Sequence, residues 1–193
     1  MLRGFALPFE RAIGDAVRAV ASAAPFRHMQ TPGGYTMSVA MTNCGAYGWV
    51  SGTRGYRYSP TDPDSDLSWP AMPSVFVELA RGAADALGFP DFVPDACLVN
   101  RYVPDARLTL HQDKDERDFH APIVSVSLGV PAVFLFGGQK RKDRPQRVPL
   151  EHGDVVVWGG PARMRYHGVA KLEESHHRFA GNTRINLTLR RAR

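Results

Sequence analysis

The sequence predicts a mainly β fold of the α+β kind, a jelly-roll supported by N-terminal helices. Two observations lead to this prediction. Short β-rich runs follow one another after Pro94, with Gly, Pro and Asp between them, which is typical of a sandwich or barrel. Two helical segments precede these runs, and together they are able to cover one face of such a sheet. The strand order does not follow from the sequence.

The two helices are marked by apolar spacing and by their ends. The first covers about Phe9–Ala24, where apolar residues recur at helical intervals, namely Ile13, Val17 and Val20. The second is expected over Pro73–Leu87, with Gly88 as its stop signal. Between them, the segment Gln30–Pro60 is rich in Gly, Thr and Tyr, which predicts short strands and turns.

The later strands are expected in seven runs, which are residues 96–103, 107–113, 122–129, 132–138, 154–160, 166–169 and 184–190. The most polar stretch, Gln139–Gln146, predicts an exposed hairpin loop. No linker is long enough to separate domains. The 193 residues therefore suit one domain with a sizeable core.

The composition limits the class of protein. An apolar fraction of 44% and a charged fraction of 22% are those of an ordinary globular protein. The net charge of +5 fits an anionic partner such as nucleic acid without requiring one. Cys44 and Cys97 are too few for a disulfide framework or a cysteine-rich zinc site, so we expect reduced, buried thiols. With no signal peptide and no run approaching the roughly 20 apolar residues of a membrane span, we expect a cytoplasmic protein without a membrane partner.

A candidate metal site is the sharpest local signal. His111 and Asp113 end a strand-like run, and residues two apart in an extended backbone face the same side. His167 ends another short run. Two histidines and one carboxylate can occupy one face of an octahedral iron(II) ion and leave adjacent positions for a co-substrate and O₂. Zinc accepts the same ligands and stays a rival.

The other histidines are also candidate ligands, namely His28, His120, His152, His176 and His177. His152 fits better as a turn residue before the strand at 154–158, and His176 and His177 lie in a polar loop that we expect to be solvated. A bare H-x-D also occurs by chance in many proteins. The metal prediction therefore needs support from elsewhere in the chain.

A polar stripe gives that support. In the segment Arg184–Arg190, polar residues alternate with apolar ones and share one face: Arg184, Asn186, Thr188 and Arg190. This face either meets water on a surface strand or points inward at a ligand, where two arginines could clamp a dicarboxylate. Asn100 and Tyr102 also stand two apart and offer hydrogen bonds suited to a carboxylate.

Together these motifs resemble the AlkB family of iron(II)- and 2-oxoglutarate-dependent nucleic-acid dealkylases. N-x-Y-x-P is Asn100–Pro104, H-x-D-x-D-E is His111–Glu116, the distal histidine is His167, and R-x-N-x-T-x-R is Arg184–Arg190. The surrounding words TPGGYTMSVAMTNCG, GYRYSP, WPAMP, PIVSVSLG and EHGDVVVWGG match as well, so the resemblance spans most of the chain. There are two departures. The family's bacterial prototype has a segment ahead of MLRGFALPFE, and Asp105 takes a turn position where glycine is common.

The resemblance implies a double-stranded β-helix with N-terminal helices and a nucleotide-recognition lid. One domain would cover 1–193, with helices and lid in about 1–95 and the jelly-roll core in about 96–193. The cofactors would be Fe(II), 2-oxoglutarate and O₂, with His111, Asp113 and His167 as iron ligands. Arg184 would pair with the 2-oxoglutarate carboxylate nearer the metal. Arg190 would clamp the distal one; the residues aiding it or lining this pocket would be Asn100, Tyr102 and Asn186.

The resemblance also implies the substrate contacts. Trp49 would stack on a flipped damaged base opposite His111, Tyr56 would contact the nucleotide backbone, and Asp115 would contact the exocyclic amine. Further substrate-binding residues would be Thr31, Met41 and Arg141, the last near the base or its phosphates. The rival interpretation is that Trp49 and Tyr56 are ordinary packing aromatics, and that the basic loop around Arg141 only aids solubility.

The function implied is repair of DNA by oxidative demethylation of N-alkylated bases such as 1-methyladenine and 3-methylcytosine. The substrate would be alkylated single-stranded DNA, with double-stranded DNA and RNA as further candidates, and the products formaldehyde, succinate and CO₂. The enzyme would act as a monomer. Two alternatives stay open: a 2-oxoglutarate oxygenase acting on a protein or small molecule, and a non-catalytic single-strand binding jelly-roll.

Overall fold

The computed structural model describes all 193 residues and consists mostly of strands. It has two α-helices, α1 (Glu10–Ala23) and α2 (Ser74–Asp85), and two short 3₁₀ helices, η1 (Leu7–Phe9) and η2 (Gly160–Ala162). The strands are β1 (Arg27–Gln30), β2 (Thr36–Gly45), β3 (Gly48–Gly52), β4 (Gly55–Ser59), β5 (Ala96–Tyr102), β6 (Leu108–His111), β7 (Ile123–Gly129), β8 (Ala132–Phe136), β9 (Gln146–Leu150), β10 (Val155–Trp158), β11 (His167–Val169) and β12 (Arg184–Arg190).

The strands from β5 onward form the two facing sheets of a jelly-roll. The major sheet has the order β5-β12-β7-β10 and continues past β5 through β2 and β1, whereas the minor sheet has the order β6-β11-β8-β9. Every pairing in these sheets is antiparallel. The chain crosses repeatedly between the sheets, so strands distant in sequence become neighbours. The predicted mainly β, jelly-roll fold class is confirmed.

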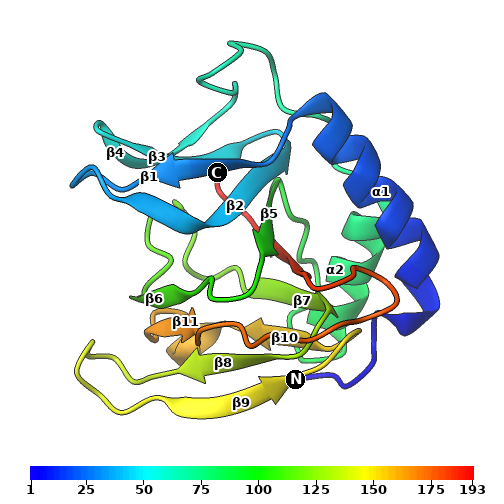
Figure 1. The fold of residues 1–193 in the computed structure, drawn as a ribbon. Coiled ribbons are helices and arrows are strands. Elements are labelled where there is room, and N and C mark those ends of the chain that lie inside the picture. Colours follow the sequence, from blue (N-terminus) through cyan, green and yellow to red (C-terminus); the bar gives the residue numbers. More distant parts are fainter.

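Both helices cover one face of the major sheet, on the right in Figure 1. The buried residues of α1 include Ile13, Val17 and Val20, and they join Phe76 and Leu79 of α2 in one core cluster with apolar residues of β5, β7 and β12. This amphipathic spacing is what allows each helix to bury one side. The apolar residues of β12 pack against the helices on the outer face of the sheet. The polar residues that alternate with them therefore face inward, between the two sheets.

A separate two-stranded hairpin, β3–β4, extends from the major sheet on the side of β1 and β2 (upper left in Figure 1). The side chain of Asn43 on β2 fixes its entry, because it accepts from the amide of Trp49 and donates to the carbonyl of Trp49, each at 3.0 Å. We call β3–β4 the lid. Trp49 and Tyr58 are register partners across it.

The predicted helices lie within a residue or two of the observed ones, and Gly88 takes a left-handed φ of +83° just after α2. The seven predicted later runs all contain strands, but β9 was not predicted, and only its first residue, Gln146, lies in the expected loop. The position of β9 at the edge of the minor sheet explains this. β9 pairs only with β8, carries Pro149 and is largely exposed. Asp105 has a left-handed φ of +73°. None of the helices combines the length and the apolar run needed to cross a membrane.

Candidate active site

Two histidines and one aspartate meet between the sheets. His111 ends β6 and is the register partner of His167, which begins β11. The Asp113 carboxylate lies 3.8 Å from Nε2 of His111 and 3.6 Å from Nε2 of His167. The three ligand atoms all lie within 4.8 Å of one another. The structure therefore brings together the three residues that the sequence marked as metal ligands.

Both histidines are oriented by backbone carbonyls. Nδ1 of His111 lies 2.8 Å from the carbonyl oxygen of Thr109, and Nδ1 of His167 lies 3.1 Å from that of Arg165. A proton on Nδ1 leaves the Nε2 lone pair for a metal. Burial, together with the nearby His167, lowers the pKa of His111 to about 4, so this ring is neutral and able to coordinate at physiological pH.

Arg190 holds the aspartate in its ionised form. Its Nε and Nη2 donate to Oδ2 of Asp113 at 2.9 and 2.8 Å. Although burial alone raises the pKa of Asp113, Arg190 and the two histidines hold this pKa well below its usual range. The Oδ1 atom makes no bond to Arg190, so it stays available as a ligand atom. Two imidazole nitrogens and one carboxylate are a donor set that fits iron(II).

A buried cationic pocket lies around Arg184, at the opposite end of β12 from Arg190. Arg184 is 1% exposed, its Nε donates to the Ser127 hydroxyl at 3.0 Å, and its guanidinium lies 4.9 Å from the Tyr102 ring centroid. Nη1 of Arg184, the Tyr102 hydroxyl and Oδ1 of Asn100 are buried without a hydrogen-bond partner. Such orphaned buried groups are costly, and a guanidinium beside a phenol fits a carboxylate that accepts from both. Burial raises the pKa of Tyr102 to about 12, so the phenol remains a donor.

The two arginines lie in the opposite order from the one implied by the resemblance. Arg190 bonds to the metal-side carboxylate of Asp113, whereas Arg184 lies at the far end of β12 against Ser127. Because a strand is extended, its two ends cannot reach the same point. The expectation that Arg184 serves the carboxylate nearer the metal is therefore replaced by Arg190 at the metal and Arg184 farther from it.

Asn186 lies between the arginines and is already committed to protein bonds. Its Nδ2 donates to the Ser125 hydroxyl at 2.8 Å, and its Oδ1 accepts from Asn100 at 3.1 Å and from Thr188 at 3.0 Å. It therefore lines the pocket and fixes the wall rather than offering free donors. The polar face of β12 is thus buried, and the alternative of a surface strand is excluded.

The lid brings two of the predicted substrate residues beside the metal ligands. The indole Nε1 of Trp49 donates to the Asp115 carboxylate at 2.9 Å, two residues beyond Asp113. Tyr56 is 45% exposed and stacks on Trp49, with ring centroids 5.5 Å apart. Met41 is buried on β2 in the cluster against which Trp49 packs. These contacts place an aromatic face and a carboxylate on the loop that carries Asp113. Within the triad, the His111 side chain is 39% exposed and that of His167 is 6% exposed.

Two further predicted residues are not brought to the metal ligands. Thr31 stabilises the β1–β2 turn, where its hydroxyl accepts from the amide of Tyr35 at 3.1 Å. Arg141 is exposed in the β8–β9 turn and has no hydrogen bond or ion pair with a site residue. Among the other histidines, His177 is not fully solvated as expected, because it stacks on His152 at 4.3 Å.

A buried network that sequence reasoning missed supports the site. Glu116 accepts from the Tyr58 hydroxyl at 2.6 Å and from Nη2 of Arg163 at 3.0 Å, and Nη1 of Arg163 donates to the carbonyl of Asp113 at 2.8 Å. The side chains of Glu116 and Arg163 are each 2% exposed. We call Tyr58, Glu116 and Arg163 the bridging network, since they join lid, loop and η2. The only sequence signal was Glu116 itself, the last residue of the H-x-D-x-D-E motif.

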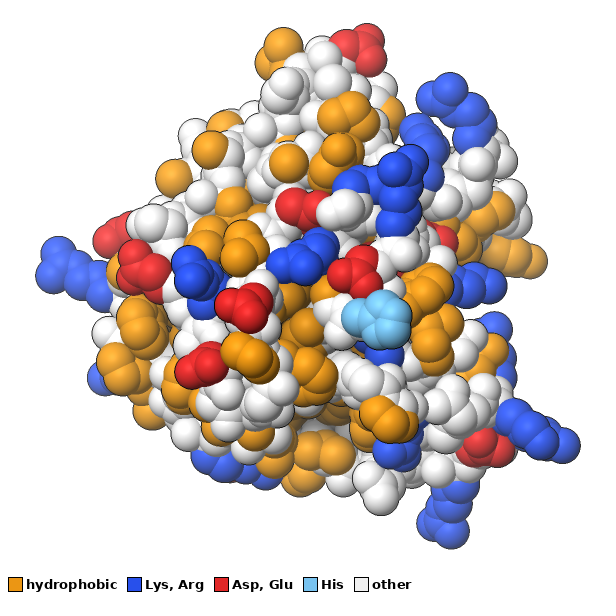
Figure 2. Space-filling view, turned by 180° about the vertical axis from the view of Figure 1, so that it is seen from behind, with side chains coloured by type: hydrophobic (Ala, Val, Ile, Leu, Met, Phe, Trp, Pro, Cys, Tyr) orange, Lys and Arg blue, Asp and Glu red, His pale blue; other side chains and the backbone are white.

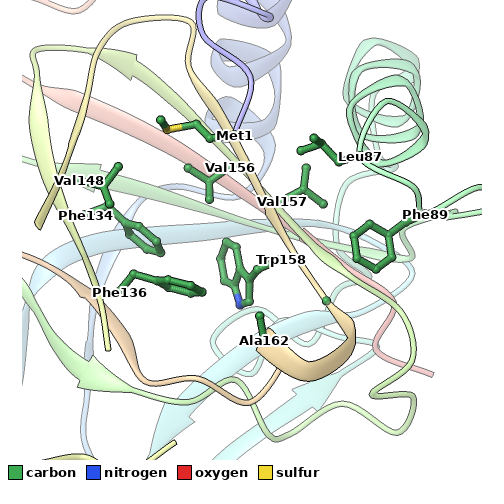
Figure 3. A pocket seen from close by; sticks show the side chains of 11 residues that line it. Met1, Leu87, Phe89, Phe134, Phe136, Val148, Val156, Val157, Trp158 and Ala162 are labelled. Atoms are coloured by element: carbon green, nitrogen blue, oxygen red, sulfur yellow. The ribbon is translucent and has the colours of Figure 1, made fainter. Parts of the chain in front are cut away.

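An apolar cavity of about 430 Å³ lies beside β8 and β10 (Figure 3). Trp158 and Phe134 line it, and their rings also pack against His167, with centroids 4.9 and 6.0 Å away. These aromatic rings keep water away from one side of His167 and hold its imidazole in place. Figure 2 shows that lysine and arginine side chains project over much of the opposite face of the molecule from Figure 1, among fewer acidic ones.

A two-histidine, one-carboxylate centre beside a buried cationic pocket inside a jelly-roll defines an iron(II)- and 2-oxoglutarate-dependent oxygenase. Comparison with known proteins agrees. The model of the 2OG-Fe(II) oxygenase superfamily matches residues 1–190. The chain is 57% identical over 192 residues to the alpha-ketoglutarate-dependent dioxygenase AlkB of Escherichia coli (strain K12), covering 100% of this chain and 89% of that protein. The protein belongs to the AlkB family.

Two other relatives extend this comparison. The DNA N(6)-methyladenine demethylase ALKBH1C of Arabidopsis thaliana is 36% identical over 137 residues, which cover 61% of this chain and 30% of that protein. The solved structure of OsALKBH1 superposes with a TM-score of 0.83 at 29% identity, covering 98% of this chain and 96% of that one. The superfamily uses Fe(II), 2-oxoglutarate and O₂. The two histidines and the aspartate fit Fe(II), and the unpartnered polar atoms around Arg184 fit 2-oxoglutarate.

Proposed function

We propose that this oxygenase repairs alkylated nucleic acid by oxidative demethylation of bases such as 1-methyladenine and 3-methylcytosine. The observation that carries the proposal is the Trp49–Asp115 pair, which joins the lid to the loop that carries the metal ligand Asp113. These lesions are cationic rings, and an aromatic face with an adjacent carboxylate attracts a cation. The relative from Arabidopsis that is named as a DNA demethylase supports a nucleic-acid substrate.

The roles of the chain's own residues follow from their contacts. His111, Asp113 and His167 would hold the iron, and Arg190 keeps Asp113 ionised and placed. Arg184 and Tyr102 would take the distal carboxylate of 2-oxoglutarate. When bound, iron and 2-oxoglutarate would supply, together with O₂, the oxidation that releases the methyl group as formaldehyde, with succinate and CO₂ as co-products. Tyr56 would lie along the nucleotide backbone, and Thr31, Met41 and Arg141 would make outer contacts.

The site favours a base outside a duplex. The triad lies between two sheets and beneath the lid, so a target base has to be flipped or already unpaired to reach it. Single-stranded DNA is therefore the preferred substrate in this proposal, with duplex DNA and RNA reached at a cost in unpairing. We further propose that one chain, as a single domain, carries the whole site and acts as a monomer in the cytoplasm, where Cys44 and Cys97 remain free thiols.

The direct test is turnover of an oligonucleotide bearing one 3-methylcytosine. With iron(II), 2-oxoglutarate and air, mass spectrometry should show loss of the methyl group and an equal amount of formaldehyde. Omitting either cofactor, or introducing His111→Ala, should abolish both signals while oligonucleotide binding persists. Formaldehyde from methylated peptides but not from the oligonucleotide would instead favour a protein oxygenase. Binding without any turnover would favour a non-catalytic module.

A further inference from the structure

Three exposed cations lie on two adjoining segments beside the lid. Lys114 and Arg117 lie on the loop that follows Asp113, and Arg193 lies just beyond β12. None of the three forms an ion pair in the structure, whereas the neighbouring Arg191 faces Asp118 at 3.8 Å. We call Lys114, Arg117 and Arg193 the basic rim.

The rim is fixed by backbone contacts rather than left on a mobile tail. The amide of Arg117 donates to the carbonyl of Ala192 at 3.1 Å. Ala192 is 0% exposed, and its amide donates to the Asp95 carboxylate at 2.5 Å, while the amide of Arg193 donates to the same carboxylate at 3.0 Å. The backbone that carries Arg117 and Arg193 is therefore held in place before any partner arrives, which reduces the entropy cost of binding.

Arg193 connects the rim to the base site. Its Nη1 donates to the carbonyl of Asp115 at 3.2 Å, and its guanidinium lies 5.6 Å from the ring centroid of Tyr58. Asp115 in turn bonds to Trp49, and Tyr58 is the register partner of Trp49. The rim is thus one contact away from the residues proposed to hold the base.

None of the nearby acids forms an ion pair with a cation of the rim. The Asp115 carboxylate is bonded to Trp49, the Asp95 carboxylate accepts two amides, and Glu116 is buried by the bridging network. Nε and Nη2 of Arg193 have no partner in the structure, although this residue is exposed. A fixed arginine with free donors is suited to bidentate contact with a phosphate.

We propose that the basic rim binds backbone phosphates of a single strand next to the base held at Trp49. The inference rests on the proposed function, because it assumes a nucleic-acid substrate at that site. It identifies Arg117 and Arg193 as the principal phosphate contacts. The effect of the rim should fall on substrate affinity and its salt dependence, since phosphate contacts position a strand without taking part in the chemistry.

The test compares single-strand binding and turnover across salt concentration for the wild type and three variants. Each phosphate contact contributes about 0.7 to the slope of log affinity against log salt. The double variant Arg117→Ala/Arg193→Ala should reduce that slope by about 1.4 and raise KM for the methylated oligonucleotide about tenfold, from about threefold per exposed contact. Arg193→Lys, which keeps the positive charge, should retain more of the wild-type salt slope than the double variant does. Arg191→Ala, which removes one charge from the same segment, should change neither quantity.

The outcomes separate the two proposals. If the double variant melts at a lower temperature but keeps the wild-type salt slope, Arg193 only anchors the segment and the rim proposal is overturned. If the wild type binds undamaged strands with a slope that depends on the rim but demethylates nothing, the rim stands as a binding surface and the proposed function fails. Equal slope losses in the Arg191→Ala control would also overturn the rim, because they would show a nonspecific charge effect.

Discussion

At the scale of single residues, Arg184 shows how a ligand pocket reveals itself in the protein without ligand. Its guanidinium is buried, its Nη1 has no partner, and burial lowers its pKa. A buried charge without a counter-ion destabilises a fold. The same charge becomes favourable when a carboxylate enters and accepts its bonds. Stability and co-substrate binding should therefore respond in opposite directions to its removal.

We expect Arg184→Met to raise the melting temperature of the ligand-free protein, because an apolar side chain of similar length replaces an unpaired charge, a gain of about 1 kcal/mol. We also expect added 2-oxoglutarate, which stabilises the wild type by mass action, to leave the variant's melting curve unmoved. Thermal unfolding with and without 2-oxoglutarate measures both effects. Arg101→Met, an exposed arginine on β5, is the control and should keep the 2-oxoglutarate shift. A variant that still responds to 2-oxoglutarate would contradict the pocket.

Asp115 tests the base-recognition half of the site. We expect Asp115→Ala to lower kcat/KM for cationic 3-methylcytosine about tenfold more than for the neutral lesion 3-methylthymine, because a charge-assisted contact of about 1.5 kcal/mol is lost only with the cation. Competition between the two lesions in one reaction measures the ratio directly. Asp118→Ala should leave the ratio unchanged, since Asp118 faces Arg191. An equal loss on both lesions would rule out the charge-selective role.

At the scale of elements, the alternation in 184–190 was sufficient to predict a strand with one polar face, and the spacing of His111 and Asp113 was sufficient to predict a candidate ligand pair. Periodicity is a local property, and these features are local. The order of Arg184 and Arg190 relative to the metal was not predictable in the same way, because it depends on which end of β12 lies against the loop after β6. The bridging network was missed for the same reason: Tyr58, Glu116 and Arg163 lie on three separate elements.

The turn between β7 and β8 offers a test of backbone constraint. Gly129 has a left-handed φ of +87°, and an added Cβ would lie 2.4 Å from the carbonyl oxygen of Thr183. We expect Gly129→Ala to destabilise the protein by about 2–4 kcal/mol, the sum of a left-handed penalty and overpacking. Gly88→Ala has a similar φ of +83° with open space around it, so it should cost only about 1 kcal/mol. Urea unfolding compares the two; equal losses would show that the clash is relieved.

At the scale of the whole molecule, the bridging network links parts of the chain that share no strand. Arg163 follows η2 and donates to Glu116 and to the carbonyls of Asp113 and Ala121. Removing one partner of a buried ion pair leaves an uncompensated charge and costs about 3–5 kcal/mol. We expect that loss for Arg163→Met, and a smaller one for the double variant Arg163→Met/Glu116→Gln, as measured by urea unfolding. If the double variant is less stable than Arg163→Met, the ion pair is not the source of the loss.

Global stability should also depend on pH through the metal ligands. In the metal-free protein, burial and His167 lower the pKa of His111 to about 4, whereas an unfolded histidine titrates near about 6.5. Between these values the unfolded chain binds a proton that the folded protein does not. Stability from this group is therefore complete above pH of about 6.5 and falls as the pH is lowered toward about 4. Because 39% of the side chain is exposed, solvent screens part of the effect.

We expect the urea midpoint of the metal-free wild type to fall more steeply across this pH window than that of His111→Gln, which cannot take up the proton. His28→Gln alters an exposed histidine outside the site and should follow the wild-type slope. Saturating manganese(II) should steepen the wild-type dependence further, since a metal that binds only neutral histidines competes with protons for the same Nε2 atoms. Parallel profiles for the wild type and His111→Gln would mean that the triad does not contribute to the acid sensitivity of the fold.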